Sequence, residues 1–172
     1  MSQLKVNSIV PVGGLPSGAN GGIIQVVSAT KTDTASFSST SFQSISGLSV
    51  TITPSSNSNK ILICSHINFG ENDARYQIFF KLTGGNCSNY VGDSGTGVQC
   101  ASCIRMDAAN TSYMQASLPL LFLDAPATTS ATTYQVQVAV AQNETVKINA
   151  PYTSHSDGGL CASTITAYEV TV

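Results

Sequence analysis

The chain has 172 residues, and its seven basic and nine acidic side chains give a net charge of −2. Charged residues make up only 9% of the sequence, against about 25% in ordinary soluble domains. No run of lysine or arginine is present that could displace counterions from phosphates, so we expect no binding to nucleic acid. Serine and threonine contribute 42 residues, which predicts a neutral surface of hydroxyl and amide groups.

The first 22 residues differ in pattern from the rest of the chain. A short strand-like piece with Leu4, Val6 and Ile9 is followed by a glycine- and proline-rich run at residues 10–22. This run lacks the lysine and the following helix of a phosphate-binding loop. Glycine permits changes of direction and proline limits flexibility, which indicates a mechanical joint. The sequence predicts an extended N-terminal arm and hinge over residues 1–22 and a β head over residues 23–172.

Apolar and polar residues alternate along several later segments, which predicts half-buried strands of antiparallel sheets. Residues 45–53 place Leu48, Val50 and Ile52 on one face and serine or threonine on the other. Residues 75–82 and 132–140 repeat the pattern with the apolar positions Tyr76, Ile78, Phe80 and Leu82, and Tyr134, Val136, Val138 and Val140. Residues 161–172 are predicted to form the last strand.

The patterns of two further segments indicate where each strand lies within its sheet. Residues 60–69 supply apolar groups to both faces, as a central strand does. Residues 113–123 contain Pro119, which lacks an N–H and fits an edge strand or a bulge better than the centre of a sheet. Some eight to ten short strands separated by turn-rich stretches predict an all-β fold, an antiparallel β-sandwich of the jelly-roll type.

The tetrapeptide Gly92–Gly95 matches the surroundings of the nucleophile in chymotrypsin-like serine proteases. Such an enzyme takes its histidine base from a separate barrel, yet the only upstream histidine, His66, lies 28 residues before Ser94 within a predicted strand. The chain is too short to build both barrels. We therefore interpret the tetrapeptide as a turn and expect no catalytic residues and no enzymatic activity.

The cysteines form an odd set of five, which argues against a disulfide framework. Cys100 and Cys103 have the spacing of one zinc knuckle, but a structural zinc site usually draws its ligands from two knuckles. The missing ligands would have to come from Cys87 or Cys161 and from His66 or His155. We expect small, mostly buried or unpaired thiols, with a disulfide or a metal ion as alternatives, and no cofactor.

Other polar and aromatic residues are candidates for a glycan site. Glu71 and Asp73 lie in one predicted turn, so they could approach each other as glycosidase carboxylates must, and Asp93 is a third candidate acid. The neighbouring Arg75 suggests a local charge pair instead. Single tyrosines at strand ends usually cover a core, but three near loops are candidate sugar-stacking platforms: Tyr90, Tyr113 and Tyr152.

The sequence shows no signs of membrane insertion or secretion. It contains no apolar run of about 18 residues and no positively charged leader with an apolar core. We therefore expect neither a membrane-spanning segment nor a signal peptide.

Four stretches of the sequence together carry a family resemblance. They are residues 4–34, which include the hinge, and residues 42–63, 121–138 and 163–170. These stretches resemble virion structural proteins of tailed phages, notably phages of marine bacteria and cyanobacteria. The resemblance covers nearly the whole chain, and only the middle, about residues 84–110, is particular to this sequence. Its motifs are scaffold motifs, so no site residues are transferred.

The resemblance implies a fibre- or spike-like protein of the phage tail or head. Residues 1–22 would dock on other virion proteins, and the β head, a homotrimer, would attach to a bacterial surface glycan or protein. Trimerisation would bury part of the two-sided strand at residues 60–69. Assembly in the host cytoplasm and release by lysis agree with the expected lack of a signal peptide. The alternatives are a capsid decoration or tail adaptor without receptor contact, and a small glycan hydrolase.

Overall fold

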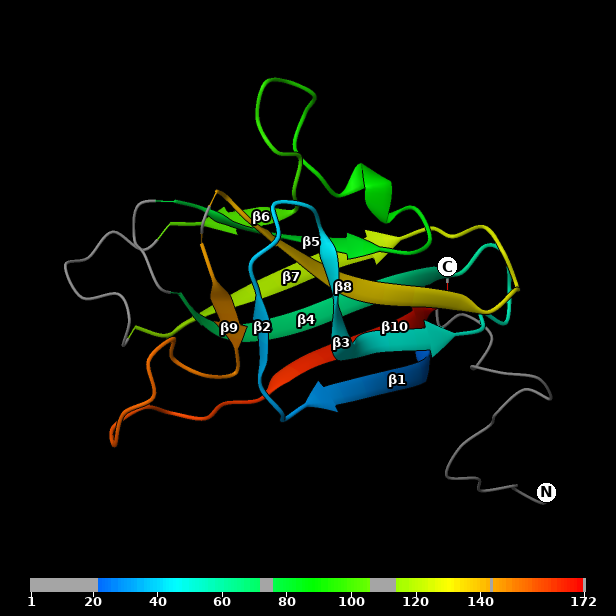
Figure 1. The fold of residues 1–172 in the computed structure, drawn as a ribbon. Coiled ribbons are helices and arrows are strands. Elements are labelled where there is room, and N and C mark those ends of the chain that lie inside the picture. Colours follow the sequence, from blue (N-terminus) through cyan, green and yellow to red (C-terminus); the bar gives the residue numbers. More distant parts are fainter. Residues whose placement is uncertain (1–21, 72–75, 106–113, 143, 172) are drawn as a thin grey trace, which may run out of the picture.

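The computed structural model describes residues 22–71, 76–105, 114–142 and 144–171, which form ten β-strands and one short 3-10 helix (Figure 1). Of the predicted arm and hinge, only Gly22 lies within the described residues. No helix in these ranges is long and apolar enough to cross a membrane. The elements are β1 (Ile23–Lys31), β2 (Ala35–Phe37), β3 (Gln43–Ile52), β4 (Lys60–Glu71), β5 (Ile78–Thr83), η1 (Cys87–Asn89), β6 (Ser102–Ile104), β7 (Ala116–Asp124), β8 (Thr132–Val140), β9 (Val146–Ile148) and β10 (Ser163–Val170).

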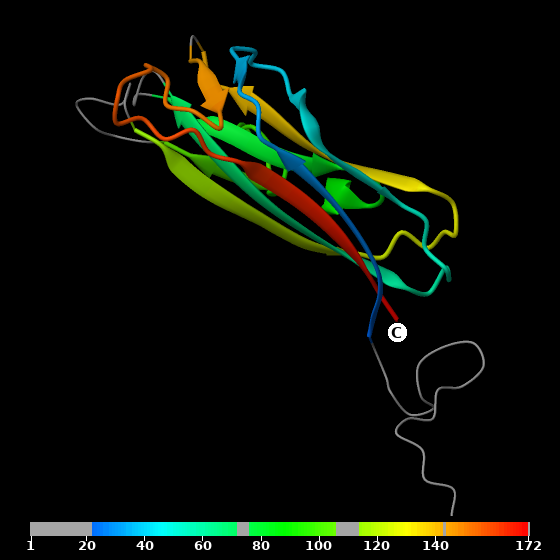
Figure 2. The ribbon, with the colours of Figure 1, turned by 90° about the horizontal axis from the view of Figure 1, so that it is seen from below.

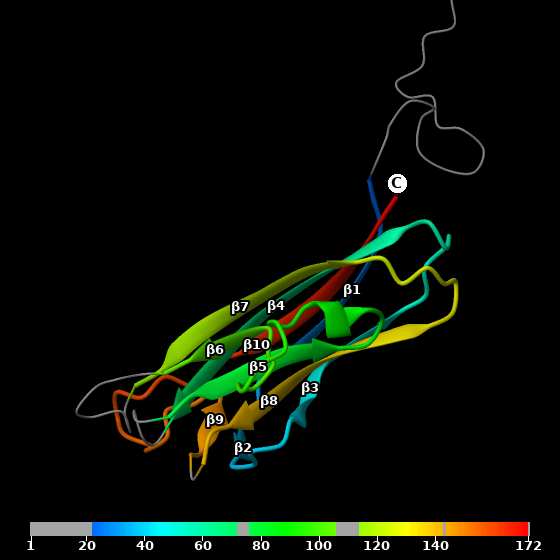
Figure 3. The ribbon, with the colours of Figure 1, turned by 90° about the horizontal axis from the view of Figure 1, so that it is seen from above.

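The strands form two antiparallel sheets packed as a sandwich (Figure 3). Sheet A has the order β1-β10-β4-β9-β2, with β7 also paired to β4, and sheet B has the order β3-β8-β5-β6. The pairing is nested, because β1 pairs with β10, β2 with β9, β3 with β8, β4 with β7 and β5 with β6. A nested ribbon of strands folded over itself is a jelly roll. The predicted all-β antiparallel sandwich is confirmed.

The strand β4 lies at the centre of sheet A, as its two-sided apolar pattern predicts. It pairs with β10 and β9 along one edge and with β7 along the other. Its residues Ile61, Ile63 and Ile67 face the core and are fully buried. The alternate residues Leu62 and Cys64 face away from the core and stay half-buried.

Among the described strands β7 pairs only with β4, so it lies at an edge, which is one of the two places that Pro119 favours. Pro119 has no N–H to offer on the outer edge. Leu121, two residues further on, directs its N–H to the same edge and donates it to the Tyr90 hydroxyl at 3.3 Å. At these two positions the edge therefore offers no donor to an incoming strand.

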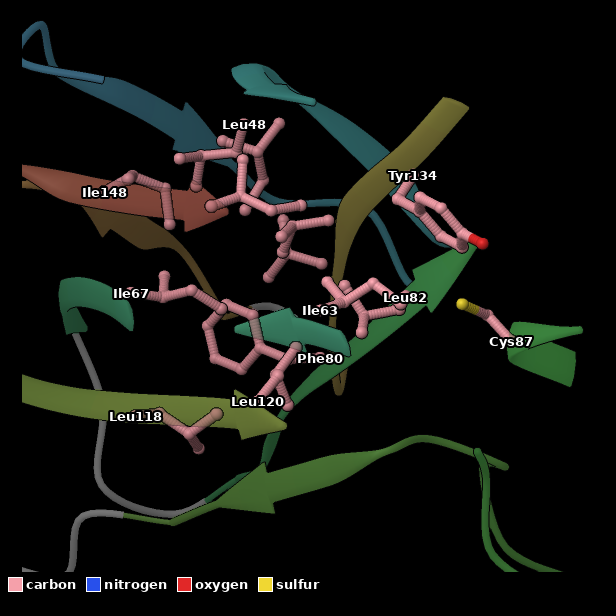
Figure 4. Packing of buried hydrophobic residues seen from close by; sticks show 14 of the residues in the cluster. Leu48, Ile63, Ile67, Phe80, Leu82, Cys87, Leu118, Leu120, Tyr134 and Ile148 are labelled. Carbon is pink, nitrogen blue, oxygen red and sulfur yellow. The ribbon is translucent and has the colours of Figure 1, made fainter. Parts of the chain in front are cut away.

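The core fills the space between the two sheets (Figure 4). Ile67, Leu118 and Leu120 come from sheet A, and Phe80 and Tyr134 come from sheet B. Burying a side chain of this size contributes about 1.5–3 kcal/mol to stability. The alternation predicted for residues 45–53, 75–82 and 132–140 is thus realised as the inward faces of β3, β5 and β8, with Tyr76 lying just before β5.

Both ends of the described chain meet at one end of the sandwich, which we call the near end (Figure 2). Ile23 at the start of β1 pairs with Val170 at the end of β10. The strands β3 and β7 end there, and β4 and β8 begin there. The opposite end, where β4 ends and β5 begins, is the far end.

A buried carboxylate at the near end, Asp124, anchors the turn that follows β5. It is fully buried and accepts the Tyr134 hydroxyl at 2.6 Å and the Asn86 N–H at 3.2 Å. The turn contains Gly84 and Gly85, whose φ angles are +99° and +49°. A Cβ at Gly85 would collide with Asp124 Oδ2, so only glycine allows the backbone to approach this closely.

A second buried carboxylate, Glu169 in β10, anchors the loop between β3 and β4. Its Oε1 accepts the Ser55 N–H at 2.6 Å, the Ser55 hydroxyl at 2.7 Å and the Asn59 amide at 2.6 Å. With the Gln25 amide oriented so that its nitrogen faces the carboxylate, it donates to Oε2 at 3.2 Å. Burial alone would raise the pKa of Glu169, but the hydrogen bonds from Asn59 and Ser55 outweigh it and lower that pKa.

The lowered pKa predicts how stability depends on pH. The contribution of Glu169 is present at neutral pH and is lost as the pH falls from the unfolded-state pKa of about 4.3 through the lower folded-state pKa. Glu169→Gln keeps an accepting oxygen but does not titrate. We expect the Tm of the wild-type chain to fall more steeply between about pH 5 and pH 3 than that of Glu169→Gln, as followed by circular dichroism. Equal slopes would contradict this role of the carboxylate.

A second substitution measures how much the hydrogen bonds to Glu169 contribute to the free energy of unfolding. Glu169→Ala leaves the donors of Ser55 and Asn59 without their acceptor, and buried donors without partners are costly. We expect the free energy of unfolding at pH 7 to fall by about 3 kcal/mol, measured by urea denaturation. Ser46→Ala, at an exposed position of β3, is the control and should change stability by less than about 0.5 kcal/mol.

Candidate functional site

The structure does not bring the protease-like residues together. Ser94 lies in the exposed segment between β5 and β6, where its N–H is bonded to Asp93 Oδ1 at 2.7 Å. His66 is exposed on the outer surface of sheet A. The segment at Gly92–Gly95 has the irregular, exposed character expected of a turn region.

The candidate glycosidase acids differ in their access to solvent. Glu71, the last residue of β4, is fully buried, whereas Asp93 is exposed in the segment between β5 and β6. Asp73 and its neighbour Arg75 lie outside the described residues. A glycosidase needs two carboxyl groups that face one open cleft, and Glu71 and Asp93 do not form such a pair.

The five cysteines are all present as thiols, and none forms a disulfide. The expectation of mostly buried thiols holds only for Cys87, since Cys103 is exposed and the others are half-buried. Burial raises the pKa of Cys87 to about 12, and the Asp124 carboxylate adds to this shift. Burial also raises the pKa of Cys100, with a further contribution from Cys103. Within the described ranges, no group of three His, Cys, Asp or Glu side chains lies close enough to hold a metal ion.

The candidate tyrosines pack against other side chains. The Tyr90 ring stacks on Phe122 with centroids 5.0 Å apart and planes inclined by 15°. Tyr152 lies next to Lys147, whose Nζ is 5.4 Å from the ring centroid and donates to the Tyr152 carbonyl at 2.6 Å. Tyr113 lies outside the described residues. Tyr90 therefore covers the rim of the core and caps the β7 edge.

The outer surface of sheet B is polar. The pairing register aligns hydroxyl and amide side chains across β3, β8 and β5 in successive rows, which are Thr51 and Thr133, then Ser49, Gln135 and Thr83, then Ser44, Gln137 and Lys81. The hydroxyls of Thr51 and Thr133 lie 2.7 Å apart, and the Gln137 amide donates to Ser44 at 3.2 Å. This surface is typical of one that stays in contact with water.

The outer surface of sheet A is apolar in its near-end half. The register places one row of large hydrophobic side chains across β1, β10, β4 and β7. In the next row Cys64 and Leu121 lie on β4 and β7, while the same row has Ser28 on β1 and Thr166 on β10. No charged side chain lies in either row. We call this set the apolar face, and it consists of Val26, Leu62, Cys64, Leu121, Leu123 and Tyr168.

The apolar face is open to solvent in the single chain. Val26 is 55% exposed, Leu121 is 60% exposed and Leu123 is 49% exposed. The next row toward the far end is polar, with Thr30, Thr164 and His66. The apolar face therefore ends at this row. A contiguous exposed apolar patch with a polar border is typical of a protein-binding surface. The apolar face is the candidate functional site.

The sequence matches no protein-family model, and it matches no curated protein. The apolar face, the polar outer surface of sheet B and the loops are therefore the features from which a function can be inferred.

The different environments of the cysteines predict an order of alkylation. The thiolate is the reacting species, so in the folded chain we expect iodoacetamide to modify exposed Cys103 first and buried Cys87 last. Peptide mass spectrometry over time at pH 8 would measure the order. In denaturant the rates should converge, which is the control. Equal rates for Cys87 and Cys103 in the folded chain would contradict the described burial.

Proposed function

We propose that the chain is a structural protein of a tailed-phage virion, a tail or head fibre assembled in the host cytoplasm. Its β head forms a homotrimer through the apolar face, residues 1–22 dock on other virion proteins, and the remaining loops attach to the bacterial surface. The observation that carries the proposal is the uncharged apolar face on sheet A. The sequence resemblance to phage virion proteins supports it.

The character of the apolar face favours a second copy of the same chain as its partner. A partner of opposite charge would need charged groups to recognise, and the two rows contain none. Three such neutral faces can meet around a three-fold axis without like-charge repulsion. Each Val or Leu that becomes fully buried there contributes about 1.5–3 kcal/mol. Cyclic symmetry would then close the assembly.

The β7 edge favours association through the face instead of strand addition. Pro119 and the bond from Leu121 to Tyr90 remove two donors from that edge. An extra strand from a neighbouring copy would lose hydrogen bonds at both positions. Copies can therefore pack side chain against side chain without extending the sheet.

The near end places the start of the head beside the apolar face. Ile23 pairs with Val170 there, and Val26 of the apolar face lies only three residues further along β1. Copies that associate through this face would bring their first strands close together. Residues 1–22 of each copy would then start from neighbouring points, which suits joint docking on one site of the particle.

Charge substitution in the apolar face tests the homotrimer. Leu123→Asp introduces a carboxylate whose burial in an interface is strongly unfavourable, so we expect trimers to become monomers in analytical ultracentrifugation. Thr51→Asp on the outer surface of sheet B is the matched control and should leave trimers intact. Both variants should keep the circular dichroism spectrum of the wild-type chain. A wild-type chain that sediments as a monomer at particle-like concentrations would overturn the trimer.

Deletion of residues 1–22 tests the docking role. We expect the shortened chain to fold and to form the same oligomer, because β1 begins at Ile23, but to be absent from purified phage particles. Immunoblots of particles from complemented infections would measure incorporation. Loss of folding would contradict the division into arm and head. A chain that enters particles but never contributes to cell binding would favour the decoration or adaptor alternative.

A further inference from the structure

The cysteines Cys100 and Cys103 lie at the start of β6, the edge strand of sheet B. In an unbroken strand, residues three apart face opposite sides of the sheet. Here the alternation is interrupted, because Ser102 is the register partner of Phe80 and Ala101 also donates its N–H to the Phe80 carbonyl at 2.9 Å. Two residues that oppose one form a β-bulge, which redirects the side chains beside it.

The bulge brings both thiols to the outer surface of sheet B. Ala101 packs against the core, so the neighbouring Cys100 is directed outward. Cys103 is exposed and lies opposite Phe79, whose neighbours in β5 face the core. The thiols of Cys100 and Cys103 are in hydrogen-bonding contact. Two cysteines that point toward each other in this way meet the geometric requirement for a disulfide.

The two thiols differ in their access to solvent, which gives them different parts in a reaction. Cys103 is exposed, whereas Cys100 is half-buried and burial raises its pKa. Because the thiolate is the nucleophile, Cys103 reacts first with a reagent from solvent, and Cys100 is placed to attack the sulfur of Cys103 afterwards. Among the described residues, no third His, Cys, Asp or Glu side chain lies close enough for the pair to hold a metal ion.

We propose that Cys100 and Cys103 form a dithiol site that small disulfides, such as glutathione disulfide, convert to an intramolecular disulfide. The Cys103 thiolate attacks one sulfur of glutathione disulfide, which releases one glutathione thiolate and leaves a mixed disulfide. The Cys100 thiolate then attacks Cys103 Sγ, forms the intramolecular bond and releases the second glutathione thiolate. The protein thus loses two electrons and two protons, which the two glutathione thiols carry away.

The disulfide would fix the base of the exposed loop at residues 92–99, which stands out from the sandwich above β6 (Figure 1). This loop closes on Cys100, since the Gly92 N–H is bonded to the Cys100 carbonyl at 3.1 Å and the Gln99 amide to the Gly92 carbonyl at 3.2 Å. A covalent bond from Cys100 to Cys103 ties the base of the loop to β6. Oxidation therefore makes the loop more rigid.

The biological meaning of the site rests on the proposed virion function. Thiols stay reduced in a cytoplasm and become oxidised outside the cell. The chain would therefore be assembled with the dithiol and would carry the disulfide after lysis. Its exposed loop would become rigid only in the released particle, when the host surface has to be bound.

Equilibration of the purified full chain in buffers of reduced and oxidised glutathione tests the site. After acid quenching, mass spectrometry should show the loss of two hydrogens, and peptide mapping should place the bond between Cys100 and Cys103. We expect amide hydrogen exchange at residues 92–99 to become at least about threefold slower on oxidation, with the exchange of β4 unchanged. Dithiothreitol should reverse both changes.

Three single substitutions separate the roles of the thiols. Cys100→Ser removes the second thiol, so we expect a stable mixed disulfide of Cys103 with glutathione. Cys103→Ser removes the exposed thiol, and its Cys100 should form the mixed disulfide at least about tenfold more slowly. Cys161→Ser changes another half-buried thiol, is the matched control and should form the Cys100–Cys103 bond as the wild type does. Circular dichroism would establish that all three variants fold.

Several outcomes would overturn the inference. They are a wild-type chain that keeps both thiols in oxidised glutathione, one that stops at the mixed disulfide, or one whose Cys103 joins another copy instead. A bond that forms without slower exchange would overturn its effect on the loop. Each result leaves the virion function to its own tests, because trimer formation and incorporation depend on the apolar face and on residues 1–22. Conversely, a chain that forms the bond but never enters particles would uphold the dithiol site and overturn the virion assignment.

Discussion

The fold depends on one constraint, the nested pairing of its ten strands. Only β5 and β6 at the centre of the nest are neighbours in the chain, and each outer pair joins segments that lie farther apart, up to β1 and β10. Such long-range pairing is entropically costly to form. The buried carboxylates Asp124 and Glu169 help to hold the paired strands and loops together, because each one bonds a loop to a strand at the near end. The two sheets and the near-end loops thus form one structure.

The strand pattern could be predicted from the sequence, because alternation and proline act locally. The central position of β4 followed from a two-sided apolar run, and Pro119 indicated an edge or a bulge for β7. The three-residue strands β2 and β9 could not be predicted, since three residues hold too little periodicity. Asp124 and Glu169 look like ordinary scattered acids in the sequence, and their burial depends on partners from distant segments.

The candidate site could be predicted only in part for the same reason. The outward residues Leu62 and Cys64 were visible as the second apolar side of a strand. Their alignment with Val26, Leu123 and Tyr168 depends on the register between four strands, which no local pattern specifies. The outer surface of sheet B is rich in hydroxyl and amide groups, so the two outer surfaces of the sandwich differ in polarity although the chain has few charges.

The hydrogen bond from the Leu121 N–H to the Tyr90 hydroxyl also affects how crowded copies of the chain can associate. With a net charge of −2, neighbouring copies repel one another only weakly, and in the proposed virion many copies would gather in a small volume. Under those conditions an open sheet edge would be a template for fibrils. The Tyr90 hydroxyl occupies the N–H of Leu121, and Pro119 has no N–H. Both positions therefore hinder the addition of a further strand at this edge. At the β7 edge, the Tyr90 hydroxyl and Pro119 thus limit strand addition without adding a charged side chain.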